Sequence, residues 1–246
     1  MDVTRPSQVA DGVSHVRKRY GRIDVLVHTA GYGLLGAVEE VDLEEARAQF
    51  ETNFFGSFNV LKAVIPVMRA QRGGHIVQMS AAGGFSATPG FSLYDASKAA
   101  MESMCEGLAQ EMAPFGVKVT IVEPGPFRTP FARKSLKRSV TVIDDYASTT
   151  GSRIRFIQRL DGRQEGDPRK AARVIISAVE SEMPPLRLPL GRYAVESIRR
   201  KLAATEKDAA AWEQAALQTT FSAPSPHEKE SREPPAPEVP VNGGVR

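Results

Sequence analysis

The chain has 246 residues, of which 41% are hydrophobic and 25% charged, as is typical of a globular protein with one ordinary core. The net charge of +3 is small, and aromatic residues are not interleaved with the basic ones, which argues against nucleic-acid binding. No apolar run reaches about eighteen residues, so no membrane span is predicted, and no metal site is predicted either. The single cysteine, Cys105, permits no internal disulfide and favours a reducing, cytoplasmic location.

Helical and strand patterns alternate along the chain. The predicted elements are, in order, a helix over 7–20, a strand over 23–27, a helix from 42 to about 67–70, a strand over 75–80, a helix over 94–112, a strand over 117–122, a helix over 168–181, a short strand over 186–188 and a helix over 194–217. Strands that alternate with helices predict an α/β fold with a parallel sheet. Residues 222–246 are rich in Pro, Glu and Ser and are predicted to be disordered.

Two strands end in loops of small or breaking residues. Ala81–Gly84 follows the strand at His75, and Glu123–Pro126 follows the strand at Val117. Ligands of open α/β sheets bind beyond the carboxyl ends of the strands. Both loops are therefore predicted to border a ligand site, next to the helix that begins at Tyr94.

Tyr94 stands four residues before Lys98 on that helix, so both side chains are predicted to share one face. A lysine near a phenol favours the phenolate, and we expect it to lower the pKa of Tyr94. The pair would then act as a general acid or base on a carbonyl or an alcohol. A surface pair without a catalytic role is the alternative, because this spacing is common in helices.

Five motifs follow one another in order between Asp2 and Thr129. They are the strand Gly21–Val27 leading to Ala30-Gly31, the segment Thr52-Asn53-Phe54-Phe55-Gly56, the small-residue loop at Ala81, Tyr94-x-x-x-Lys98, and Pro124-Gly125-x-x-x-Thr129. In these motifs the chain resembles the classical short-chain dehydrogenase/reductase family, nearest its hydroxysteroid and retinol dehydrogenase branch. The resemblance implies a Rossmann-type doubly wound parallel sheet and hydride transfer between NAD or NADP and a carbonyl or secondary alcohol.

The resemblance also implies roles for single residues. Tyr94 would exchange the proton with the substrate oxygen, Lys98 would lower its pKa and hold the nicotinamide ribose, and Asn53 would anchor a water in a relay to Lys98. The other residues implied in cofactor binding are Asp2 and Val3 at the adenine, Ala30 and Gly31 where the backbone is approached, and Pro124, Gly125, Phe127 and Thr129 at the nicotinamide. Simpler interpretations stay open: a helix kink at Asn53, a plain turn at Pro124-Gly125 and a disordered terminus at Asp2.

The family's glycine-rich dinucleotide loop is missing, because Met1–Thr4 aligns with the end of its third strand. Gly31–Gly36 has the spacing Gly-x-Gly-x-x-Gly, but it aligns with the loop after the fourth strand and is interpreted as a chance match. The expected sheet is therefore N-terminally truncated, and the apolar strand 23–27 is left uncovered, which is an aggregation hazard. An incomplete gene model or a late start codon is favoured over a genuine half-domain.

The second departure concerns the catalytic serine. In the family it lies thirteen positions before the tyrosine, a position occupied here by Ala81. Ser80 is adjacent, but neighbouring residues at a strand end point in different directions. Ser80 would therefore replace the serine only through a local shift.

The predicted organisation is a remnant cofactor-binding and catalytic core over 1–129, a mobile substrate lid over 130–166, C-terminal helices and the last strand over 167–221, and a disordered tail over 222–246. Basic residues gather in and beside the lid, at Arg128, Arg133, Lys134, Lys137, Arg138, Arg153, Arg155 and Arg159. They indicate either a solvated lid or an attraction for an anionic group on a ligand.

The predicted function is an NAD- or NADP-dependent oxidoreductase that acts on a small-molecule carbonyl or alcohol, as a homo-oligomer or paired with a related chain. The alternative is a degenerate, noncatalytic member or partner subunit, which Ala81 and the missing glycine-rich loop favour. A truncated product that folds poorly is the third hypothesis.

Overall fold

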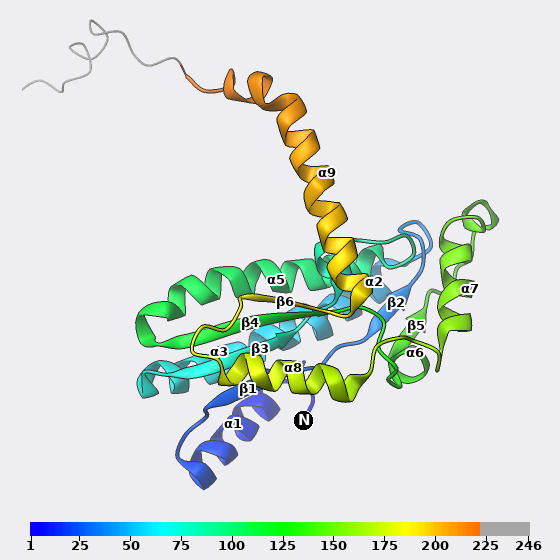
Figure 1. The fold of residues 1–246 in the computed structure, drawn as a ribbon. Helices are drawn as coiled ribbons and strands as arrows, with labels where there is room; N and C mark the ends of the chain where they lie inside the picture. Colours follow the sequence, from blue (N-terminus) through cyan, green and yellow to red (C-terminus); the bar gives the residue numbers. More distant parts are fainter. Residues whose placement is uncertain (222–246) are drawn as a thin grey trace, which may run out of the picture. The chain divides into compact units, whose positions relative to one another are not determined.

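A parallel sheet forms the centre of the computed structural model, which describes residues 1–221 (Figure 1). Its order is β1 (Val25–His28), β3 (Gly74–Met79), β4 (Val117–Pro124) and β6 (Arg187–Leu190), with all neighbours parallel. The predicted Rossmann-type parallel α/β fold is confirmed.

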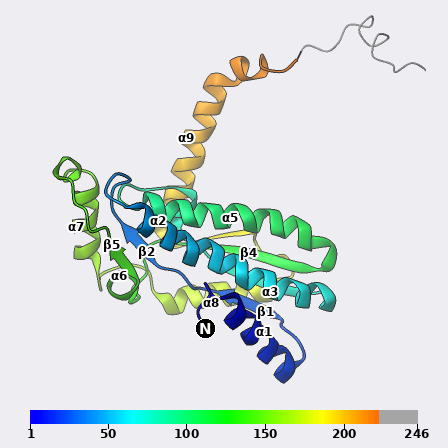
Figure 2. The same cartoon turned by 180° about the vertical axis from the view of Figure 1, so that it is seen from behind.

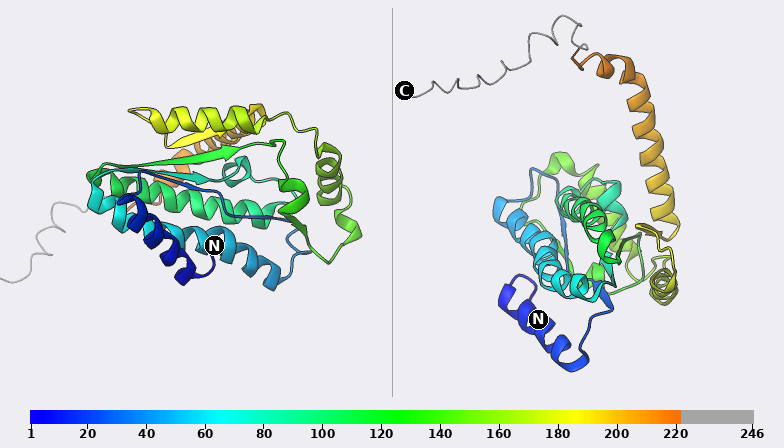
Figure 3. Two further views of the ribbon diagram at one scale, coloured as in Figure 1. Left: turned by 90° about the horizontal axis from the view of Figure 1, so that it is seen from below. Right: turned by 90° about the vertical axis from the view of Figure 1, so that its left-hand side faces the viewer.

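Helices cover both faces of this sheet (Figures 2 and 3). On one face, α1 (Pro6–Tyr20), α3 (Gly56–Gln71) and α5 (Ser92–Met112) form a core with Ile76 and other buried strand residues. On the other, α8 (Pro168–Glu180) packs against Val77 and its neighbours. Successive side chains of a strand point to opposite faces, so Ile76 and Val77 serve the two cores.

The helix predicted from residue 42 is three consecutive segments. Asp42 and Glu45 form a capping box at the start of α2 (Leu43–Phe50), which confirms the predicted start. A π-helical turn, η1 (Glu51–Phe55), then leads into α3. Such turns insert an extra residue into a helix and often occur at functional sites. Asn53 lies in this turn.

A second, two-stranded sheet joins distant segments. β2 (Gly33–Leu35) is buried and pairs in parallel with β5 (Leu136–Arg138). The glycine-spaced segment at residue 31 therefore continues into a buried strand rather than a phosphate loop, as predicted.

The segment predicted as a long lid loop contains regular structure. It includes α6 (Phe131–Lys134), β5, a 3₁₀ turn η3 (Asp144–Tyr146) and α7 (Thr150–Leu160). Ile154 is buried on the apolar side of α7. This burial stabilises the helix, although the sequence of the segment shows no strong helical pattern. Short segments α4 (Ala82–Phe85) and η2 (Ala113–Phe115) complete the unit that ends at Leu202.

The final helix α9 (Arg192–Leu217) begins in the unit Met1–Leu202 and continues into a second compact unit that starts at Ala203. No helix within residues 1–221 is long and apolar enough to cross a membrane. The tail predicted to be disordered, 222–246, lies outside the described residues.

Candidate active site

A cavity of about 830 Å³ opens at the carboxyl ends of β3 and β4. Its walls are mainly apolar and combine the loops after β1, β3 and β4 with α5, α7 and α8. This is the edge at which ligands of open α/β sheets bind. Both loops singled out in the sequence border it.

Tyr94 and Lys98 both line the cavity from α5. The Lys98 Nζ lies 5.9 Å from the centroid of the Tyr94 ring and donates to the main-chain oxygen of Met79 at 3.0 Å. Phe91 and Phe131 pack against the Tyr94 ring, with centroid distances of 5.7 and 6.1 Å. The predicted pairing on one helix face is therefore present, and it is buried rather than on the surface.

The net pKa of Tyr94 is raised in this structure, not lowered as expected from Lys98 alone. Burial, and then the charge of Asp95, raises the pKa of Tyr94 above its ordinary value. Burial also lowers the pKa of Lys98 to about 8, which weakens the positive charge beside the phenol. The phenol is consequently protonated at neutral pH, the form in which it donates a proton.

Asn53 connects the loop after β1 to α5. Its side-chain amide donates to the oxygen of Tyr32 at 2.9 Å and to Ser97 Oγ at 3.0 Å, while its Oδ1 accepts from the Tyr32 amide at 3.0 Å. Its main-chain oxygen accepts from Ser57 Oγ at 2.7 Å. The side chain is fully buried and lies behind the cavity wall rather than in it.

Gly31 provides the test of whether a dinucleotide fits beside Lys98. Its φ is +154°, and a Cβ at this position would lie 3.0 Å from Asn53 Oδ1 and 3.3 Å from Lys98 Nζ. Any side chain would therefore fill the space next to the lysine, which only glycine leaves free. The residues predicted at the nicotinamide, Pro124, Gly125, Phe127 and Thr129, line the same cavity as Gly31. These residues fit the nicotinamide end of the cofactor.

The residues predicted at the adenine lie elsewhere. Asp2 accepts from the amide and the hydroxyl of Thr4, at 3.0 and 2.8 Å, and Val3 is buried against Gly56. Neither borders the cavity, and Ala30 packs against the core instead. No group of three or more His, Cys, Asp or Glu suited to a metal occurs within residues 1–221.

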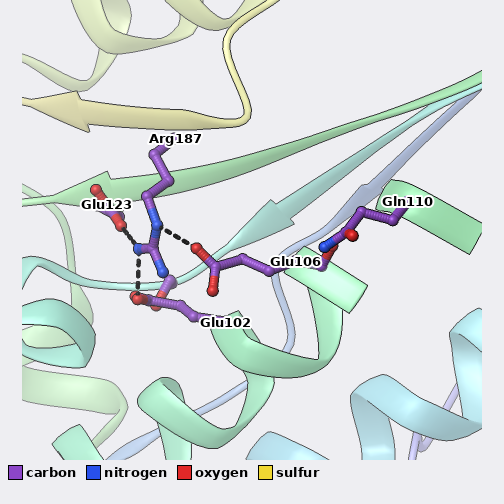
Figure 4. A network of polar contacts seen from close by, with 6 residues as sticks. Glu102, Glu106, Gln110, Glu123 and Arg187 are labelled. Carbon is purple, nitrogen blue, oxygen red and sulfur yellow. Dashed lines mark hydrogen bonds and ion pairs between the residues drawn. The ribbon is translucent and has the colours of Figure 1, made fainter. Parts of the chain in front are cut away.

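The serine position is occupied as the sequence indicates. Ser80 and Ala81 both line the cavity, but the Ser80 hydroxyl donates to the buried carboxylate of Glu102. Glu102 is in turn bound by Arg187 at 2.8 Å, within the network that Figure 4 shows. Because Ser80 is already engaged, the structure does not place its hydroxyl as a substitute for the missing serine.

Two further side chains in the wall were not identified as site residues from the sequence. Asp95 accepts from the Thr88 amide at 2.9 Å, and burial raises its pKa to about 7. Arg153 reaches the cavity from α7. In the sequence, the only signal for Asp95 as a site residue was its position directly after Tyr94. Arg153 could not be distinguished from the other members of a basic cluster.

Comparison with known proteins identifies close relatives. A sequence model of short chain dehydrogenases matches residues 1–139. The chain is 39% identical to the oxidoreductase BOA17 of Botryotinia fuckeliana and 38% identical to a 3-ketodihydrosphingosine reductase of Bacteroides thetaiotaomicron; the matches cover 80% and 78% of this chain and 71% of each relative. Retinol dehydrogenase 8 of Bos taurus is 34% identical over 76% of this chain and 61% of its own length.

Solved structures show the same likeness. A short-chain dehydrogenase from Streptomyces avermitilis superposes with a TM-score of 0.84 at 40% identity, covering 90% of this chain and 80% of that one. A short chain dehydrogenase from Burkholderia cenocepacia in complex with NADP gives 0.64 at 29% identity, covering 86% and 77%.

Proposed function

This chain belongs to the short-chain dehydrogenase family of oxidoreductases, whose cofactor is NAD or NADP, and we propose that it reduces a small-molecule carbonyl compound with Tyr94 as the proton donor. The observation that carries the proposal is the buried juxtaposition of Tyr94, Lys98 and Gly31 at one end of an apolar cavity. The reverse reaction, oxidation of a secondary alcohol, uses the same groups.

When bound, the reduced nicotinamide supplies the hydride for the carbonyl carbon. Tyr94 Oη donates its proton to the carbonyl oxygen, so that an alcohol forms. Lys98 Nζ donates one hydrogen bond to the main-chain oxygen of Met79, which fixes its position. Its other N–H groups remain available for the ribose hydroxyls. Its charge stabilises the phenolate that remains after the proton leaves.

The apolar wall supports this chemistry by excluding water. Phe91 and Phe131 flank the Tyr94 ring, and the Tyr94 side chain is buried. In a dry site the attraction between Lys98 and a developing phenolate is stronger than in water. The raised pKa of Tyr94 keeps the phenol protonated at neutral pH, so the proton is present for donation to a carbonyl oxygen.

The proposal is tested with the purified chain in two steps. Calorimetric titration with NADPH and NADH measures cofactor binding, and the loss of nicotinamide absorbance measures turnover on a panel of aldehydes and ketones. Tyr94→Phe is expected to lower kcat by about 10²- to 10⁴-fold with unchanged cofactor affinity, because only the proton donor is lost. Tyr146→Phe is the matched control, since Tyr146 is half-buried and donates to Glu39 outside the cavity.

Two results contradict the proposal. Equal turnover by Tyr94→Phe and the unchanged chain would remove Tyr94 from the chemistry. Saturable NADPH binding without turnover of any carbonyl or alcohol would instead support the noncatalytic alternative, which rests on Ala81 at the serine position.

A further inference from the structure

One arginine of α7 stands in the wall of the cavity. Helix α7 carries Arg153, Arg155 and Arg159 and has no acidic residue. The guanidinium of Arg153 lies 5.4 Å from the centroid of the Phe156 ring and 6.0 Å from that of Tyr193, and it donates to Tyr193 Oη at 3.4 Å. The aromatic rings hold its planar group in place.

Arg153 has few partners for a charged group. Its Nε is buried and has no hydrogen-bond partner within residues 1–221, and none of their carboxylates forms an ion pair with its guanidinium. Asp95 also lines the cavity and is influenced by the charge of Arg153, but burial raises the pKa of Asp95 to about 7, so its own charge is incomplete at neutral pH. A desolvated donor without an acceptor is costly, and an anionic ligand would relieve that cost.

Arg153 also borders a second hollow. This space of about 420 Å³ shares Thr88, Arg153 and Phe156 with the main cavity. Its other walls include the hydroxyl residues Ser148, Thr149 and Ser152 together with Arg159. Guanidinium and hydroxyl donors are the groups that bind carboxylate and phosphate oxygens. The main cavity, by contrast, is mainly apolar.

We propose that the substrate has an apolar body that carries an anionic oxygen group, a carboxylate or a phosphate, and that Arg153 binds this group while the carbonyl faces Tyr94. The inference rests on the proposed function and adds the substrate class to it. It also resolves the two interpretations of the basic segment: Arg153 recognises an anionic ligand, whereas Arg155 donates to the main-chain oxygen of Ala147 and does not line either hollow.

The experiment measures binding without relying on turnover. Straight-chain carboxylates from butanoate to dodecanoate, the matching primary amides and the matching alkyl phosphates are titrated calorimetrically, with and without NADP. The unchanged chain is expected to bind the best carboxylate or phosphate about ten- to a hundredfold more tightly than its amide, as charged hydrogen bonds imply. Comparing the two anion series identifies which anion the site prefers.

Arg153→Gln is expected to remove this preference, Arg153→Lys to keep part of it, and Arg155→Gln to leave it unchanged. NADPH affinity is expected to be equal in all four proteins, which separates a substrate anion from the phosphates of the cofactor. Unchanged NADPH affinity of Arg153→Gln would show that its loss of the preference does not come from misfolding.

The inference is overturned if amides bind as tightly as both anion series, if no anion binds saturably, if both arginine-to-glutamine variants lose the preference equally, or if Arg153→Gln loses NADPH affinity. Its failure is separable from that of the proposed function. If Tyr94-dependent reduction of neutral ketones is observed without an anion preference, the inference is wrong and the proposed function stands. If anions bind through Arg153 but no turnover is observed, the proposed function is wrong and the anion site is still supported.

Discussion

In the proposed reaction, hydroxyl groups near Tyr94 determine how strongly the reacting oxygen is bound. Ser80 and Ala81 both border the cavity, but the Ser80 hydroxyl donates to Glu102 and Ala81 has no hydroxyl. A carbonyl oxygen at Tyr94 therefore has one hydroxyl donor fewer than the family pattern supplies. Losing such a donor weakens transition-state stabilisation by a few kcal/mol, on the order of what one oxyanion donor contributes.

Ala81→Ser is accordingly expected to raise kcat for carbonyl reduction by about tenfold or more, because it restores a donor at the cavity wall. The measurement is steady-state turnover on the best carbonyl of the panel. Ser80→Ala is the matched control; it should lower the free energy of unfolding through the loss of its bond to Glu102 and leave kcat nearly unchanged. The reverse pattern, with kcat sensitive to Ser80 and insensitive to position 81, would contradict this assignment.

At the level of elements, Arg187 connects the last strand of the sheet to β4 and to α5. Arg187 in β6 binds Glu102 and Glu106 of α5, each at 2.8 Å, and Glu123 of β4 (Figure 4). Glu102 and Glu123 are almost completely buried, and burial raises the pKa of both, that of Glu123 to about 7. One guanidinium thus faces three carboxyl groups, so the network depends on pH.

Arg187→Met is expected to lower the free energy of unfolding by about 3 kcal/mol at roughly pH 8, because it leaves buried carboxylates without their partner. The loss should be smaller near pH 5. A carboxyl whose pKa is higher in the folded state than its unfolded value of 4.5 keeps its proton there, so stability falls as the pH rises through about 7.

Urea unfolding at the two pH values measures this effect. Arg192→Met, at an exposed position at the start of α9, is the control and should change stability little at either pH. An equal loss at both pH values for Arg187→Met would show that the carboxyl groups do not titrate with folding.

At the level of the whole molecule, the α8 layer does not reach β1 at the end of the sheet, although Leu26 of β1 packs against the core on the other face. Val27 is the register partner of Val77, but α8 covers only Val77, and Val25 and Val27 are 40% and 51% exposed. β1 also has β3 as its one partner strand within the described residues. The uncovered apolar strand that the sequence predicted is therefore present.

An open apolar strand is expected to drive self-association of the isolated chain. The double change Val25→Lys/Val27→Lys should raise the concentration at which light scattering increases by several-fold, because two charges must be desolvated in any such contact. Val16→Lys removes an exposed valine from α1, away from the sheet, and should have little effect. An equal shift for both would indicate a general effect of added charge. A homo-oligomer or a pairing with a related chain stays a prediction.

Local patterns in the sequence determined most of the elements and the central pair of the site. Gly21 adopts a left-handed conformation where α1 ends, and Asp167 caps α8, because turns and caps depend on a few adjacent residues. Tyr94 and Lys98 were found for the same reason, since a spacing of four fixes their relation on any helix.

Tertiary structure alone decided the features that depend on burial and on distant partners. The pairing of β2 with β5 joins segments about a hundred residues apart, and neither segment shows it. The pKa of Tyr94 rises because of burial and the charge of Asp95. The Ser80 hydroxyl is engaged because Glu102 approaches from α5, and Arg153 reaches the cavity because α7 forms part of its wall. Desolvation and long-range contacts arise only when the chain is packed, so no local pattern encodes them.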